Sequence, residues 1–189
     1  LPGKIFGTQF IIEKLENCTV LLMDYSGDCQ IDFCKNCTFL IGPVEGPLFI
    51  RDCENCTFTA ACRQFRSRDC TNCNLNLYVL TDPIVETSTN MIFRNFNGAY
   101  PKLKEQFESA GLDPLDNHWR SVYDFNEGDD AIAQPHYLVE DDEMPMWIER
   151  LDGESGEPQN PVALNDGSFF VAPADEATSV EAPMSPARD

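Results

Sequence analysis

The chain has 189 residues, of which 42% are hydrophobic, and this is sufficient for one domain with a buried core. Its formal net charge of −19 is uneven, because residues 1–126 carry 16 acidic and 11 basic side chains, whereas residues 127–189 carry 16 acidic and 2 basic ones. Such acidity argues against nucleic-acid binding, which depends on clustered Lys and Arg. The sequence contains no run of 18 apolar residues, so it predicts no transmembrane helix.

An internal repeat runs through the first half of the chain. The dipeptide Asn-Cys occurs at 17–18, 36–37, 55–56 and 72–73, in steps of 19, 19 and 17 residues. After each Asn-Cys, apolar and polar residues alternate as in a half-buried strand, and asparagine suits a corner because it tolerates left-handed backbone. A step of this length accommodates one coil of a parallel β-helix. The sequence therefore predicts an all-β fold, a parallel β-helix over residues 1–98, with an asparagine ladder along one edge.

Three of the repeats read Cys-x-x-Cys, which in isolation suggests a zinc site. The earliest repeat, however, has Leu15 where the others have Cys34, Cys53 and Cys70, and leucine can replace a packed thiol but not a metal ligand. A packed core with no metal is therefore the favoured interpretation, and zinc is the alternative. The nine cysteines are odd in number and closely paired, so they do not suit a secreted disulfide framework. They predict reduced thiols in a cytoplasmic or ciliary compartment.

A polar row precedes the last Asn-Cys, in the segment CRQFRSRDC. Alternation places Gln64, Arg66 and Arg68 on one strand face, about 6–7 Å apart, and places Phe65 and Ser67 on the other. Arginine suits an anion because its planar guanidinium binds phosphate in two places and stays charged. A surface that meets an anion is one interpretation of this row, and a solvated or ion-paired basic strand is the other.

Residues 99–111 predict a short helix, with Pro101 near its start and Gly111 just past its end. Its apolar stripe is expected to cap the β-helix or pack beside it, and residues 99–128 are expected to close the same domain. The three aromatic residues that follow the helix are expected in the core: Trp119, Tyr123 and Phe125.

Residues 129–189 form an acidic appendage rich in Asp, Glu, Pro, Gly and Ala, a composition typical of irregular chain. Two apolar islands interrupt it, and Trp147, Phe169 and Phe170 in them are candidate anchors on a partner. This composition predicts an extended tail that docks either on its own domain or on a large assembly.

Several ordered motifs resemble the family of tubulin-folding cofactor C and the X-linked retinitis pigmentosa protein over about residues 1–128. They are LPGKIFGTQFIIEKLENC, GPVEGPLFIRDCENC, ACRQFRSRDC, DPIVETSTN, and YPKLKEQFESAGL followed by NHWRSVYDF. The resemblance implies a right-handed parallel β-helix with a short capping helix. It also implies GTPase-activating activity toward an Arf-like small GTPase or tubulin, linked to cilia or microtubules.

By that resemblance, Arg66 is an arginine finger supplied in trans, Gln64 supports the interface, and Glu86 supports the arginine. Arg68 and Phe65 are expected to contribute to the interface. The chain itself needs no cofactor, since GTP and Mg²⁺ would belong to the partner, and no phosphate loop of the form G-x-x-x-x-G-K-[ST] occurs in the sequence.

Two function classes remain open at this point. One is a regulatory protein that activates a GTPase through Arg66. The other is a non-catalytic component of a ciliary, axonemal or cytoskeletal assembly, which uses the β-helix and the acidic tail as docking surfaces.

Overall fold

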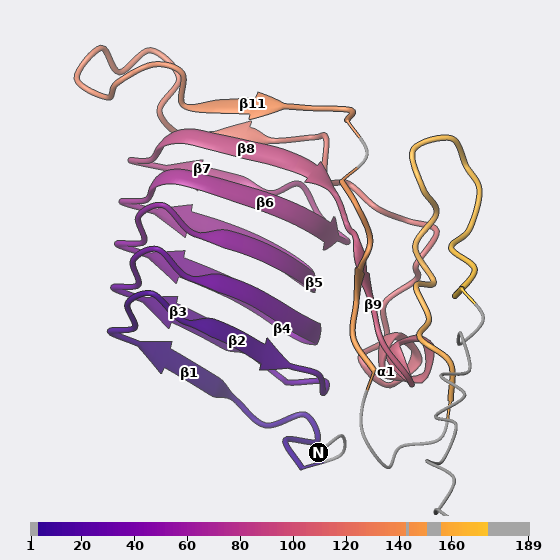
Figure 1. Cartoon of the computed structure of the whole chain (residues 1–189). Helices are drawn as coiled ribbons and strands as arrows, with labels where there is room; N and C mark the ends of the chain where they lie inside the picture. Colours follow the sequence, from indigo (N-terminus) through magenta and orange to yellow (C-terminus); the bar gives the residue numbers. More distant parts are fainter. Residues whose placement is uncertain (1–3, 143, 151–155, 174–189) are drawn as a thin grey trace, which may run out of the picture.

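The repeat folds into stacked coils of a parallel β-helix, as the sequence predicts (Figure 1). The computed structural model describes residues 4–142, 144–150 and 156–173. Strands of neighbouring coils are parallel and join residues one repeat apart, for example Ile31 with Ile50 and Thr38 with Thr57. The parallel pairing places equivalent residues of successive repeats above one another, so a property repeated in the sequence becomes a column in space.

The coils have two main faces. The first face contains β2 (Thr19–Leu22), the early part of β4 (Thr38–Arg51) and of β5 (Thr57–Arg68), β6 (Thr71–Val79), β8 (Thr89–Asn95) and β11 (Tyr137–Val139). The second face, which we call the arginine face, contains β1 (Phe10–Glu13), β3 (Cys29–Asp32), the late parts of β4 and β5, β7 (Ile84–Glu86) and β10 (Tyr123–Asp124).

An asparagine ladder forms one corner of the stack. Asn17, Asn36, Asn55, Asn72 and Asn90 have left-handed backbone with φ between 52° and 55°. From Asn36 onward, each side-chain amide donates a hydrogen bond of 2.7–3.4 Å to the Oδ1 atom of the asparagine one coil before it. Asn90 is a fifth rung that the Asn-Cys pattern misses, because Met91 stands in place of cysteine.

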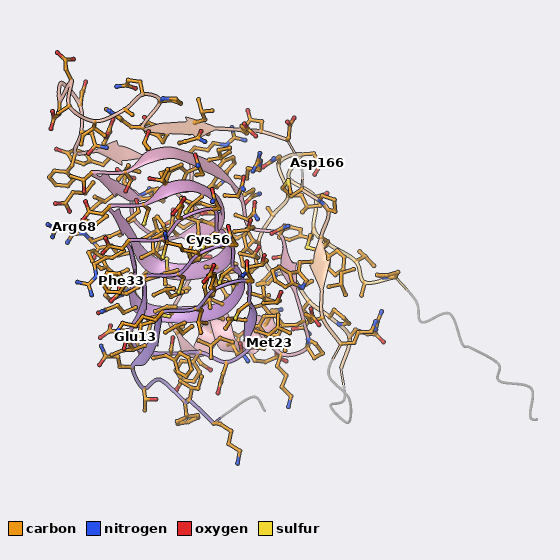
Figure 2. All side chains as sticks on the ribbon, turned by 60° about the vertical axis from the view of Figure 1, so that its left-hand side comes forward. Glu13, Met23, Phe33, Cys56, Arg68 and Asp166 are labelled. Atoms are coloured by element: carbon orange, nitrogen blue, oxygen red, sulfur yellow. The ribbon has the colours of Figure 1, made fainter. Side chains whose placement is uncertain are left out.

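The cysteines of the repeat lie inside the coils, where Figure 2 shows Cys56. Two columns run along the axis, one with Cys34, Cys53 and Cys70 and one with Cys37, Cys56 and Cys73, all at most 1% exposed. Their Sγ–H groups donate to backbone carbonyl oxygens within the coils. No group of three His, Cys, Asp or Glu side chains within the described residues is placed to hold a metal ion.

The helix α1 (Leu103–Ser109) lies beside the coils near β9 (Gly98–Ala99), and not over an end of the stack (Figure 1). The predicted stripe of Leu103, Phe107 and Ala110 is buried against the side of the β-helix. Of the two placements that the sequence left open, capping the β-helix or packing beside it, the helix takes the second. It is fixed there by Gln106, whose Nε2 donates to the Met23 carbonyl at 3.2 Å. Among the described helices, none is long and apolar enough to cross a membrane.

The described part of the tail packs on its own domain. Strand β11 continues the first face by pairing with β8, and β12 (Trp147–Ile148) pairs with β9. Farther along, Val162 is buried in the same cluster as the helix stripe. The tail is irregular over most of its described length, as its composition predicts, but part of each apolar island packs on the chain's own domain. The histidines also have partners: His118 contacts Asp82 and Asp116, and the buried His136 contacts Asp124 at 2.8 Å.

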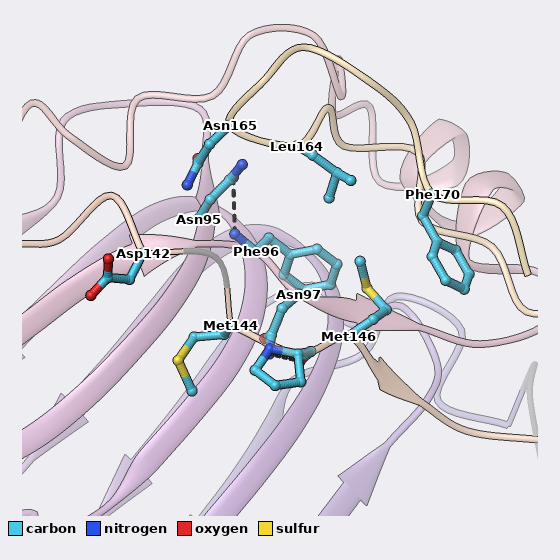
Figure 3. A pocket seen from close by; sticks show the side chains of 10 residues that line it. Asn95, Phe96, Asn97, Asp142, Met144, Met146, Leu164, Asn165 and Phe170 are labelled. Carbon is cyan, nitrogen blue, oxygen red and sulfur yellow. Dashed lines mark hydrogen bonds between the residues drawn. The ribbon is translucent and has the colours of Figure 1, made fainter.

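The three predicted tail anchors have different environments. Trp147 is half-buried against the helix-side cluster, and its Nε1 donates to Glu149 at 2.7 Å. Phe170 lines a cavity of about 360 Å³ together with Phe96, Met144 and Met146 (Figure 3). Phe169, by contrast, is 52% exposed. Trp147 and Phe170 therefore contact their own domain, and only Phe169 of the three points to solvent.

Candidate functional site

The end of β5 alternates as the sequence predicts. Gln64 and Arg66 are half-buried and Arg68 is exposed on the outside of the coil, whereas Phe65 and Ser67 face the interior. Phe65 is fully buried, and its ring meets the ring of Phe93 edge to face at 6.1 Å. The expectation that Phe65 contributes to an interface is therefore wrong, because a side chain inside the coil cannot touch a partner. Its role is to pack the coil that carries the polar row.

Arg66 lies in the middle of the arginine face. Its Cα pairs with that of Phe49 in β4 on one side and with that of Ile84 in β7 on the other. The guanidinium carbon is 5.6 Å from the centre of the Phe49 ring. The Nε atom is shielded from solvent and has no hydrogen-bond partner among the described residues. Arg66 is thus a half-buried cation whose Nε donor is unused among the described residues, and its strand neighbours are apolar side chains.

A second arginine on this face, Arg51, has a different environment. Its Nε and Nη2 atoms donate to the two carboxylate oxygens of Asp32 at 2.9 and 2.5 Å, and Gln30 donates to Asp32 as well. Burial would raise the pKa of Asp32, which is 3% exposed, but the hydrogen bonds from Arg51 and Gln30 outweigh it and hold that pKa below its ordinary value. Arg51 is therefore neutralised within the chain.

Arg68 and Glu86 lie side by side. Their Cα atoms are register partners between β5 and β7, one step along the strands from the inward pair Ser67 and Val85. Figure 2 shows Arg68 at the rim of the stack, on the same side as Phe33 and Glu13. Its Nε is 3.4 Å from Asp69, and both side chains are about half exposed. Among the described contacts, none joins the Glu86 carboxylate to Arg66, so no hydrogen bond from Arg66 to Glu86 supports the arginine in this structure.

Two aromatic side chains that we expected in the core lie on this surface instead. Trp119 is buried as predicted, but Tyr123 and Phe125 are each 57% exposed, with their rings 5.0 Å apart. Tyr123 pairs with Ile84 through β10, so the two rings stand above the row that contains Arg66. Alternation in the segment VYDFN is the signal that the sequence offered, since it places both rings on one face of a short strand.

The surface combines one unpaired guanidinium, a neighbouring basic and acidic pair, and an apolar border. Such a surface can meet an anion on a partner, because Arg66 presents donors that no carboxylate of the described chain occupies. It is an open face of a rigid sheet and not a pocket, so a ligand would be presented to it by another macromolecule.

Comparisons with known proteins agree with this architecture. The family model described as tubulin binding cofactor C matches residues 7–125. A protein XRP2 from Danio rerio is 41% identical over 178 residues, which are 89% of this chain and 47% of that protein. A protein XRP2 from Mus musculus is 54% identical over 125 residues, which are 66% of this chain and 36% of that protein.

A tubulin-specific chaperone C from Homo sapiens is 32% identical over 139 residues, which are 72% of this chain and 40% of that protein. These relatives are thus matched over less than half of their own length. Among solved structures, tubulin binding cofactor C from Leishmania major has the same fold, with a TM-score of 0.53 and 22% identity over 64% of this chain and 84% of that one. The region matched by the family model contains the whole arginine face and the first face as far as β8, and the chain belongs to the tubulin binding cofactor C family.

Proposed function

We propose that this chain stimulates GTP hydrolysis by an Arf-like small GTPase or by a tubulin-related GTPase, and that Arg66 enters the nucleotide site of that partner. The observation that carries the proposal is the state of Arg66. It lies on a rigid sheet in the middle of an open face, and no acidic side chain of the described residues pairs with it.

The chemistry follows from the charge that develops when the γ-phosphoryl group is transferred to water. Negative charge spreads over the transferring group and the leaving oxygen, and an arginine supplied in trans stabilises it. Arg66 can do this because its donors are not committed within the chain. Arg51 cannot, because its guanidinium already donates hydrogen bonds to both carboxylate oxygens of Asp32. The nucleotide and Mg²⁺ would be held by the partner.

Gln64 and Arg68 flank Arg66 on the same outward row, about 6–7 Å away on each side. We propose that they contact the surface of the GTPase around the nucleotide, and that Glu86 sets the position of Arg68. The exposed pair Tyr123 and Phe125 would add apolar contact area at the border of the same interface.

The proposal is tested by single-turnover GTP hydrolysis with purified Arf-like GTPases and with tubulin as candidate partners. Wild type should accelerate hydrolysis by one of them, and Arg66→Ala should remove about 10³-fold or more of that acceleration. Arg120→Ala is the matched control, since Arg120 pairs with Asp141 and lies outside the outward row of β5. Equal acceleration by wild type and Arg66→Ala would contradict the proposal.

We further propose a cytoplasmic location at the cilium or flagellum or at the basal body, and the resemblance noted from the sequence motifs is what motivates it. Imaging of a tagged full-length protein tests this. The alternative of a purely structural component depends on tail residues that can reach a partner. Its support is reduced by Trp147 and Phe170, which contact their own domain, and of the three predicted anchors Phe169 is the exposed one.

A further inference from the structure

We propose that Phe49 is a positioning residue for Arg66: its ring holds the guanidinium in place and keeps it apart from carboxylates until an acceptor arrives. This inference rests on the proposed function, because it concerns how the finger is prepared. It is derived from the environment of Phe49, whose side chain emerges from β4 on the arginine face.

The geometry is fixed by the sheet. Phe49 and Arg66 are register partners in neighbouring coils, and both point outward. The guanidinium carbon of Arg66 is 5.6 Å from the ring centre, within the range of about 6 Å in which a cation is attracted to an aromatic face. Because the pairing of β4 with β5 brings the two residues side by side, the contact does not depend on the conformation of a long loop.

The same ring contacts a second guanidinium, which provides an internal comparison. The Arg51 guanidinium carbon is 5.4 Å from the ring centre, but Arg51 is also bound to both oxygens of Asp32. Phe49 therefore lies beside one arginine that a carboxylate binds and one for which, among the described residues, the ring is the recorded side-chain contact. If Arg66 had been paired with an acid, moving it to a phosphate would leave a buried carboxylate without its partner, which is costly.

A contact with an aromatic ring avoids the cost of leaving a carboxylate unpaired. A cation–π contact at a partly exposed site is weaker than a buried ion pair, so little is lost when the guanidinium moves to a phosphate. The contact still limits the rotamers of Arg66 in the free protein, which lowers the entropy lost on docking. The Nε donor, shielded and without a partner in the described structure, gains a hydrogen bond only when an acceptor is delivered.

The experiment compares Phe49→Leu, which keeps much of the apolar volume but removes the ring, with Phe49→Tyr, which keeps the ring. The first measurement is NMR of the Arg66 side chain, whose Nε–H and δ-proton signals carry a ring-current shift from Phe49. We expect the shift to disappear in Phe49→Leu and to remain in Phe49→Tyr. An unchanged Arg66 signal in a folded Phe49→Leu protein would overturn the contact.

The second measurement is single-turnover hydrolysis at saturating activator. Phe49→Leu should slow hydrolysis about two- to fivefold, with little change in the half-saturating concentration, whereas Phe49→Tyr should retain the wild-type rate. In an Arg66→Ala background, Phe49→Leu should have no further effect. An equal loss in both backgrounds would show that Phe49 acts through the fold or the interface and would overturn the positioning role.

The two proposals fail in different ways. If Arg66→Ala does not slow hydrolysis, the proposed function is overturned, together with any role of Phe49 in it, while NMR still decides whether the ring holds Arg66. If Arg66→Ala slows hydrolysis and Phe49→Leu does not, the proposed function stands and the positioning role is overturned. Circular dichroism of each variant confirms that the coils are intact.

Discussion

Arg68 of β5 faces Glu86 of β7 across the parallel ladder, whereas Arg66 faces Ile84. The acidic residue of the site is therefore aligned with the outer arginine and not with the central one. The distinction matters, because a carboxylate beside Arg66 would compete with an incoming phosphate, whereas a carboxylate beside Arg68 leaves Arg66 available.

We predict that Glu86 acts mainly through Arg68. In a double-mutant cycle of Glu86→Gln and Arg68→Gln, the two substitutions should be coupled by up to about 1 kcal/mol, as expected for opposite charges directly across a parallel ladder. Coupling of Glu86→Gln with Arg66→Lys should be smaller. Activation of GTP hydrolysis is the measurement, and stronger coupling to Arg66 than to Arg68 would contradict the register argument.

The asparagine ladder predicts an unusual ranking of substitutions. Asn55→Ala removes two amide hydrogen bonds and places a Cβ-bearing apolar residue at φ 54°, which should cost about 1–2 kcal/mol of unfolding free energy. Asn55→Gly loses the same bonds without the backbone strain, so it should be the milder change. Urea unfolding measures both, and a glycine variant less stable than the alanine variant would refute the strain component.

The buried thiols predict low reactivity and no dependence on metal. Burial raises the pKa of Cys56 and of Cys73 to about 12, so their reactive thiolate forms are scarce near neutral pH. A thiol reagent added to the native protein should modify the half-exposed Cys18 first and the interior columns only on unfolding. Mass spectrometry after timed labelling measures this order.

A chelator provides the complementary measurement. The melting temperature should be the same with and without it, and elemental analysis of the purified protein should find no stoichiometric zinc. A large fall in melting temperature on chelation would restore the zinc interpretation of the Cys-x-x-Cys pairs.

The pair of Asp32 and Arg51 predicts a pH dependence of stability. Since the folded pKa of Asp32 lies below its unfolded value of about 3.9, its contribution is complete above that value and is lost as the pH falls through the folded pKa. Asp32→Asn should therefore lower stability near neutral pH and flatten the acid limb of the stability curve. Urea unfolding as a function of pH measures both effects.

Arg51→Ala measures how much the ion pair with Asp32 contributes to the free energy of unfolding. It leaves a carboxylate that is only 3% exposed without its cation, at a cost of about 2–3 kcal/mol. The double variant with Asp32→Asn should recover part of that loss. Recovery of nothing would indicate that Arg51 stabilises the face through packing on Phe49 and not through the ion pair.

Much of this molecule is predictable from its sequence because β-helix coils repeat. The period of Asn-Cys gives the stack, and alternation gives the outward row of Gln64, Arg66 and Arg68. The same alternation placed Phe65 inside, and assigning it to an interface contradicted that pattern. Asn90 was missed because the repeat was defined by a cysteine, while the corner depends on the asparagine alone.

The tail and the aromatic border are harder to predict for a physical reason. Strands of two or three residues, such as β10 and β12, are too short to show a period. They form because β7 and β9 offer unpaired edges, which is a property of the folded sheet and not of the local sequence. The residue beside Arg66 is equally hard to predict from the local sequence, because the register of β4 with β5 is what identifies it as Phe49.

That register depends on an irregularity in β4. Between Ile41 and Pro47 the pairing with β5 slips from a separation of 19 residues to one of 17. If the spacing of 19 had continued, Pro47 would lie beside Arg66 and Phe49 would lie beside Arg68. Two one-residue slips, on either side of Val44, thus select the neighbour of the central arginine, and because together they shift the register by two residues, they preserve the inside and outside of each strand. An insertion or deletion between Ile41 and Pro47 therefore changes which residue of β4 lies beside Arg66 and leaves the rest of the coil unchanged.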